Sequence, residues 1–272
     1  MSQFPTGKCC VCGETTTTTC GACLHAGTNL FFCSRDHQKL VWKTHKAVCG
    51  ARSNPFTLPP LSKDEMAIFE RQTRDQLRGV DLEDWAIDCI QSTFQRTPDE
   101  YFKVSLSLQS ENPTRLERYF RSYTRSRHVS AIGRRYTDLA LIRQEYTLLT
   151  PFHLASWFRV NLADSVQLDY TPGFNVFEHA ALVYCTLLLL DFEDTPPASY
   201  SRDLLPKAAE QFVRAIFDAA RGGVARRDVE MVRTFVQDMS AMFYDLDINY
   251  KYDLRTGTVS DIRCTGGPRT FT

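Results

Sequence analysis

Eight cysteine and histidine side chains near the start of the sequence have the spacing of metal ligands. They form four pairs: Cys9 and Cys12, Cys20 and Cys23, Cys33 and His37, and His45 and Cys49. The first two pairs are Cys-x2-Cys, and the last two place their members four residues apart. Each spacing lets one short segment grip a tetrahedral zinc ion, and eight ligands complete two four-coordinate sites. We therefore predict two Zn²⁺ ions per chain, with no open position for a catalytic water.

The two later pairs constrain how the ligands are shared. Residues four apart on a helix lie on one face, so each later pair points in one direction. If the intervening segment is helical, His37 and His45 are about 12 Å apart along the axis. One ion cannot span that distance, so the later pairs should serve different ions and each recruit one Cys-x2-Cys pair. Spacing alone leaves open a sequential arrangement with all four early cysteines on one ion.

The early cysteines could in principle have roles other than metal binding. Seven of the ten cysteines fall within the first 49 residues, interleaved with histidine. In a reducing compartment this pattern favours metal over disulfides, redox thiols or merely buried cysteines. Cys10 could replace Cys9, but Cys10-x-Cys12 is a poorer pair, so we predict Cys9. His25 is a spare candidate that we interpret as a loop residue.

The run Phe32-Cys33-Ser34 to His45-x3-Cys49, with Gln38 and Trp42 between, resembles the second half of a MYND finger. The resemblance covers residues 9–49. It implies interleaved ligands: Cys9, Cys12, Cys33 and His37 on one zinc, and Cys20, Cys23, His45 and Cys49 on the other. The family usually has Cys where this chain has His37, which is also a competent zinc ligand.

MYND fingers are protein-interaction modules that often take Pro-x-Leu-x-Pro peptides. The resemblance therefore implies that Phe32, Ser34, Gln38 and Trp42, which match family positions without being ligands, form a peptide-binding surface. The alternative is that Phe32 and Trp42 fill the core of the finger. The segment Pro55-x2-Leu58-Pro59 is one residue off the peptide pattern, so a self-docked linker is a further option.

Enzyme classes find little support in the sequence. Some MYND fingers lie inside SET-domain methyltransferases, but here eight residues precede Cys9 and the Asn-His-Ser-Cys stretch of that family is absent. No Gly-x-Ser-x-Gly elbow, phosphate loop or Gly-x-Gly-x-x-Gly is present. We interpret His128, His153 and His179 as surface or core histidines. The expectation is an adaptor and not an enzyme.

An arginine-rich segment, residues 115–135, is the alternative functional feature, for nucleic acid or an acidic partner. Its arginines on one predicted helix face are Arg115, Arg118, Arg121 and Arg125, with Arg127, Arg134 and Arg135 behind. The aromatic residues take the opposite face, where a core-facing stripe belongs. A solvated arginine face is therefore the preferred interpretation. The loaded finger also has a net charge near +1, too low to favour nucleic acid.

The rest of the chain predicts a mainly α protein. We expect a small two-zinc finger of short β and α elements (1–52), a Pro-rich linker (53–60), an all-helical domain (61–247), and a tail or small hairpin (248–272). Ser62 and Glu65 have the capping-box pattern of a helix start. The helices expected from apolar spacing are 62–77, 81–94, 114–126, 136–149, 152–163, 177–192, 204–220 and 227–244.

Composition points to an intracellular protein, in cytoplasm or nucleus. Lys plus Arg and Asp plus Glu are 32 each, which favours neither nucleic acid nor an acidic membrane as partner. The longest apolar run, Ala180 to Leu190, is shorter than the roughly 20 residues needed to span a bilayer. It suits a helix at the centre of a bundle. The N-terminus shows no secretory or mitochondrial pattern.

Overall fold

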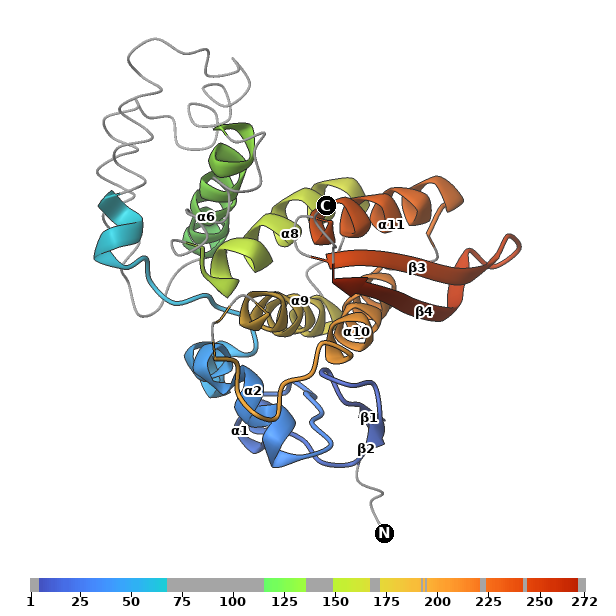
Figure 1. Cartoon of the computed structure of the whole chain (residues 1–272), viewed down its shortest axis with the longest axis horizontal. Helices are drawn as coiled ribbons and strands as arrows, with labels where there is room; N and C mark the ends of the chain where they lie inside the picture. The colour runs from blue at the N-terminus through green and yellow to red at the C-terminus, as the bar shows by residue number, and fades with distance from the viewer. Residues whose placement is uncertain are drawn as a thin grey trace.

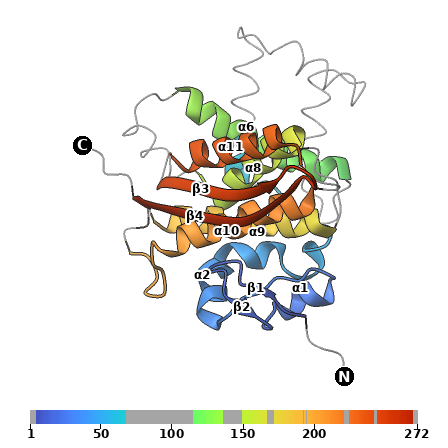
Figure 2. The same ribbon diagram turned by 90° about the vertical axis from the view of Figure 1, so that its right-hand side faces the viewer.

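The computed structural model describes residues 5–67, 115–135, 149–166, 172–220 except Phe192 and Asp194, 224–241 and 244–268. The cysteine-rich segment lies at one end of the molecule, against α9 (Pro172–Leu190) and α10 (Leu204–Ala219) (Figure 1). Seen from the side, a β-hairpin lies between α10 and α11 (Arg226–Ser240) (Figure 2). The predicted fold class, a small two-zinc segment followed by a helical region, is confirmed.

The cysteine-rich segment is built from very short elements around one longer helix. Strands β1 (Gly7–Lys8) and β2 (Thr15–Thr16) pair antiparallel, and α1 (Gly21–His25) follows. Helix α2 (Arg35–His45) starts where the Ser34 hydroxyl accepts a hydrogen bond from the His37 amide, a normal N-cap. The 3-10 turns η1 (Lys46–Val48) and η2 (Gly50–Arg52) carry the chain into the linker.

Five longer helices make up the described part of the helical region. They are α6 (Arg115–Arg135), α8 (Pro151–Val166), α9, α10 and α11. Each overlaps a helix predicted from apolar spacing. The start of the predicted helix 62–77 is described, with Ser62 and Glu65 exchanging capping hydrogen bonds. The predicted helix 81–94 and nearly all of 136–149 lie outside the described residues.

Helix α9 is the buried centre of this region, as its uninterrupted apolar run predicts. It packs against α8, α10 and α2. Aromatic rings from three helices meet here: Phe158 of α8 lies edge-on to Phe212 of α10, which stacks on Phe177 and Tyr184 of α9. Residues 173–190 would be long and apolar enough to cross a bilayer, but most of this window is buried inside the protein. A core helix has the same properties.

The end of the chain forms a β-hairpin, one of the two forms expected for residues 248–272, but the hairpin begins earlier, at Tyr244. We expected a helix to continue to Tyr244, but α11 ends at Ser240 and β3 (Tyr244–Asp253) begins there. The first half of β3 alternates buried apolar with exposed polar residues, which is the period of a strand on a core. It pairs antiparallel with β4 (Thr258–Pro268). This β3–β4 hairpin packs on α10 and α11.

The predicted solvated arginine face is wrong for its two central members. Arg121 and Arg125 of α6 are each 1% exposed. The Arg121 guanidinium donates to the Leu58 carbonyl at 2.9 Å, and Arg125 donates to the carbonyls of Pro59 and Pro60. The two arginines thus supply hydrogen-bond donors to three successive carbonyls of the Pro-rich linker. These two guanidinium groups are therefore unavailable to nucleic acid.

Arg125 also forms a buried ion pair. Its Nε lies 2.6 Å from Oε1 of Glu65, the residue that caps the helix start after the linker. Burial opposes ionisation of Glu65, but the hydrogen bonds from Arg125 prevail and hold its pKa below the usual value. Because Phe56 and Leu58 are buried as well, the Pro-rich linker is fixed along the helical region.

Candidate metal centre

The first cluster joins the first Cys-x2-Cys pair, here called the first knuckle, to the start of α2. Cys9 and Cys12 come from the turn after β1. Cys33 directly precedes the N-cap of α2, and His37 lies in the first turn of that helix. Cys12 Sγ lies 3.5 Å from Cys33 Sγ, and Nδ1 of His37 lies 3.1 Å from Cys33 Sγ and 3.7 Å from Cys9 Sγ. Three of the four are partly exposed.

The second cluster lies at the other end of α2. Cys20 and Cys23 come from the start of α1, and His45 and Cys49 flank η1. Nε2 of His45 lies 3.4 Å from Cys20 Sγ and 3.6 Å from Cys23 Sγ, and Cys49 Sγ lies 3.5 Å from Cys20 Sγ. Three of these four are buried. Helix α2 thus separates the sites, as the spacing of His37 and His45 predicts.

These distances fit two zinc ions. With Zn–S near 2.3 Å and Zn–N near 2.0–2.1 Å, the edges of a tetrahedron are about 3.8 Å between sulfurs and about 3.5 Å between sulfur and nitrogen. The ligand atoms of each cluster all lie within 4.8 Å of one another. The interleaved grouping is the arrangement that the family resemblance implied, and the sequential one does not occur. Four protein ligands close each site.

In the absence of a cation, burial favours the neutral form of several of these thiols. Burial raises the pKa of Cys12 to about 12 and raises the pKa values of Cys33 and Cys49. The hydrogen bond with Cys23 instead lowers the pKa of Cys20 to about 3. Burial lowers the pKa of His37, which favours the neutral imidazole that binds metal. Packing several thiolates together requires a positive charge at the centre, which Zn²⁺ supplies.

The spare candidates take other roles. The buried thiol of Cys10 donates to the Phe31 carbonyl at 2.9 Å, so it points away from the ligand cluster. His25 is exposed in the last turn of α1. Gly13 ends the first knuckle with φ +75°, a conformation that favours glycine, and a Cβ there would lie 2.8 Å from Gln211 Nε2. The knuckle therefore approaches α10 closely.

A comparison with protein families matches residues 9–49 to the MYND finger. The match begins and ends on the first and last zinc ligands. Residues 9–49 are a MYND finger. No curated protein and no solved structure matches the chain. The family of the helical region is therefore unassigned, and its role must be inferred from its own residues.

The second zinc site of the MYND finger is part of an interface with α9. The ring of His179 lies edge-on to the ring of ligand His45, with centroids 5.8 Å apart, and edge-on to Phe56 at 4.7 Å. Nε2 of His179 lies 3.3 Å from the Ser53 carbonyl. Asn175, one turn earlier, accepts a hydrogen bond from the Phe56 amide and donates to the Asn54 side chain. The sequence left His179 as a surface or core histidine and carried no signal of this contact.

The residues predicted to bind peptide fall into two groups. Trp42 is 44% exposed, Ser34 is exposed and Gln38 is half-buried, all along α2. Gln38 and Trp42 are four residues apart and so share a helix face. Phe32 is only 2% exposed and packs near His45, so it belongs to the core of the finger and not to this surface.

The three remaining histidines named from the sequence are all buried. His153 is held in a neutral form: its Nδ1 accepts a hydrogen bond from the Thr150 amide, and its Nε2 lies 3.4 Å from Glu65. Its ring lies beside His128, with centroids 4.9 Å apart. Of the two alternatives predicted for these histidines, surface or core, all three including His179 take the core one.

Proposed function

We propose that this protein is a non-enzymatic adaptor whose MYND finger recruits a partner protein through a short proline-containing peptide. The carrying observation is Trp42, a large aromatic side chain that stays 44% exposed on a helix fixed between two zinc sites. An exposed Trp beside a glutamine amide offers an apolar face and a hydrogen-bonding group to an extended Pro-rich strand.

The closed zinc sites support an interaction role over catalysis. Each cluster provides four protein ligands, which leaves no position for a substrate or an activated water. The zinc ions then act by folding the finger, which fixes α2 and the side chains along it.

The linker supports the idea that this surface is available to a partner. Its buried Phe56 and Leu58, and its hydrogen bonds to Asn175, Arg121 and Arg125, hold it against α6 and α9. The linker considered from the sequence as self-docking thus bonds to α6 and α9, and its described hydrogen bonds and ring contacts include none with Ser34, Gln38 or Trp42. We further propose that the protein acts inside the cell, where its free thiols stay reduced.

The test is peptide binding to the full, zinc-loaded chain, because the finger shares its core with α9. A fluorescein-labelled Pro-x-Leu-x-Pro peptide is titrated and its anisotropy is measured for the wild type and for Trp42→Ala. A central Trp anchor is worth 2 kcal/mol or more, so affinity should fall about 30-fold. Leu24→Ala is the matched control, since Leu24 is 39% exposed on α1 of the same finger. Equal affinity for Trp42→Ala and the wild type would refute the proposed surface.

A further inference from the structure

A second surface with the features of a binding site lies in the helical region. Between α11 and the distal half of β3 is a hollow of about 320 Å³, lined by Arg226, Glu230, Arg233, Tyr250 and Tyr252, with Leu254 at its edge. This volume is near the lower end of the range of about 300–1,000 Å³ for ligand pockets. It suits one or two side chains of a peptide better than a cofactor.

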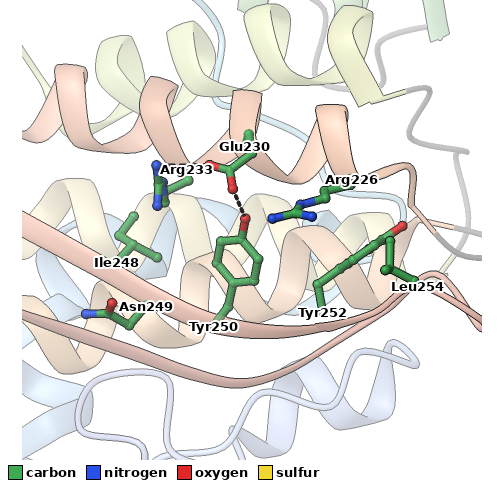
Figure 3. A pocket seen from close by; sticks show the side chains of 8 residues that line it. All are labelled: Arg226, Glu230, Arg233, Ile248, Asn249, Tyr250, Tyr252 and Leu254. Atoms are coloured by element: carbon green, nitrogen blue, oxygen red, sulfur yellow. Dashed lines mark hydrogen bonds and ion pairs between the residues drawn. The ribbon is translucent and has the colours of Figure 1, made fainter.

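The side chains around Tyr250 are organised by hydrogen bonds. Tyr250 points from β3 toward Glu230 on α11, with the guanidinium groups of Arg233 and Arg226 on either side of it (Figure 3). The Tyr250 hydroxyl donates to Oε1 of Glu230, and Arg233 Nη2 lies 2.9 Å from Oε2. Both oxygens of the one carboxylate are thus engaged.

The hollow carries a net positive charge. Glu230 is neutralised by Arg233, and burial together with Glu230 raises the pKa of Tyr250 to about 12, so the phenol stays protonated. Within the described chain, Arg226 has no carboxylate within ion-pair distance, and it is exposed. Arg202, Arg214 and Arg263 do form such pairs. Arg226 therefore gives the hollow its net positive charge, which is complementary to an anionic group.

The neighbouring groups suit an extended peptide. Leu254 is 76% exposed, and the phenol of Tyr252 is fixed by its hydrogen bond to the Val224 carbonyl. These provide apolar contact beside the two guanidinium groups. In both views α11 lies on the opposite side of the β3–β4 hairpin and α10 from the MYND finger (Figures 1 and 2). The two surfaces can therefore be occupied at once.

We propose that the hollow formed by α11 and β3 is a second docking site, which takes a carboxylate side chain of an acidic peptide segment in a partner protein. Arg226 and Arg233 bind the carboxylate, and Tyr252 and Leu254 contact the flanking residues. This site does not depend on the finger, so the proposal can be tested independently of the proposed peptide surface at Trp42.

The experiment uses the full zinc-loaded chain and a labelled eight-residue peptide of alternating Glu and Ala, with its Gln-Ala counterpart as the neutral probe. Anisotropy should show saturable binding of the acidic peptide only, weakening as salt rises. Arg226→Gln and Arg233→Gln should each reduce affinity roughly tenfold, as expected for a lost hydrogen bond between charged groups. Trp42→Ala should leave this binding unchanged.

Two further variants make the result specific. Arg263→Gln removes the same charge from an exposed position of β4 and should leave affinity unchanged. Glu230→Gln removes the negative charge of the hollow and should increase affinity, an outcome that misfolding cannot produce. Absence of saturable binding, or equal loss in Arg263→Gln, would overturn the proposal. Competition by inorganic phosphate at concentrations that leave ionic strength matched would identify a site for free anions, and would overturn it too.

Discussion

The imidazole of His45, a ligand of the second zinc site, lies edge-on against the imidazole of His179 in α9, with ring centroids 5.8 Å apart. The ring centroids of Phe32 and Trp42 each lie 5.9 Å from that of His45. The metal ligand is therefore held by packing from both the finger and the helical region. Because α9 also lies at the centre of the core, zinc binding and the stability of the helical region should be coupled.

The two zinc ions should leave the protein at different rates. Three ligands of the first site are partly exposed, whereas three of the second are buried, and one of these, His45, packs against His179 of α9. With a chelator in excess and a chromophoric zinc indicator, we expect release in two phases of about equal amplitude. His37→Ala should abolish the fast phase and retain the slow one. A single phase carrying both ions, or loss of the slow phase in this variant, would contradict the assignment.

Phe56 should be as important to stability as a residue of the central core. It is buried between the finger and α9, with its ring 4.7 Å from His179. Phe56→Ala should lower the free energy of unfolding by about 3–5 kcal/mol, measured by urea denaturation with zinc present. The exposed Leu254 is the comparison, since Leu254→Ala should change it by less than about 0.5 kcal/mol. A loss for Phe56→Ala as small as this would mean that the finger and α9 are not coupled.

The sequence predicted the metal chemistry well because zinc ligands have narrow local requirements. Cys-x2-Cys and pairs four residues apart are short-range patterns, and the long stripe of α10 and the apolar run of α9 are equally local. The choice of partners between knuckles was not local, and it came from the family resemblance. The structure has that same interleaved grouping.

The arginines of α6 illustrate what sequence periodicity could not provide. An arginine every three or four residues usually lies toward solvent, yet Arg121 and Arg125 are buried. Their acceptors are carbonyls of residues about 60 positions earlier, together with Glu65. No single-residue propensity encodes such a long-range pairing. The aromatic Phe32 was ambiguous for a related reason, because the pattern that predicts a docking surface also predicts a small core.

Arg125 and Glu65 should be strongly coupled. Arg125→Leu leaves a buried carboxylate and two linker carbonyls without their donor, which should cost about 3–5 kcal/mol. Glu65→Leu alone should lower the free energy of unfolding by a similar amount. The double variant should lose less free energy of unfolding than the sum of the losses in the two single variants, because neither charge is left unpaired. Urea denaturation of the four proteins gives the coupling energy, and simple additivity would show that the pair is not a unit.

Stability should fall in mild acid because of His153. Burial lowers its pKa to about 3, against an unperturbed value near 6.5, so the unfolded chain takes up a proton that the folded chain does not. Protonation below pH 6.5 therefore favours unfolding. Between pH 6.5 and 5.5 this group alone should reduce the free energy of unfolding by about 1 kcal/mol.

The matched variant is His153→Gln, whose amide can still accept from the Thr150 amide and donate to Glu65 but does not titrate in this range. Its unfolding free energy should decline about 1 kcal/mol less than that of the wild type over the same interval. Zinc content is measured at both pH values, so that loss of metal, which affects both proteins alike, is separated from the histidine. Identical pH dependence in the two proteins would mean that His153 is not kept neutral by the fold.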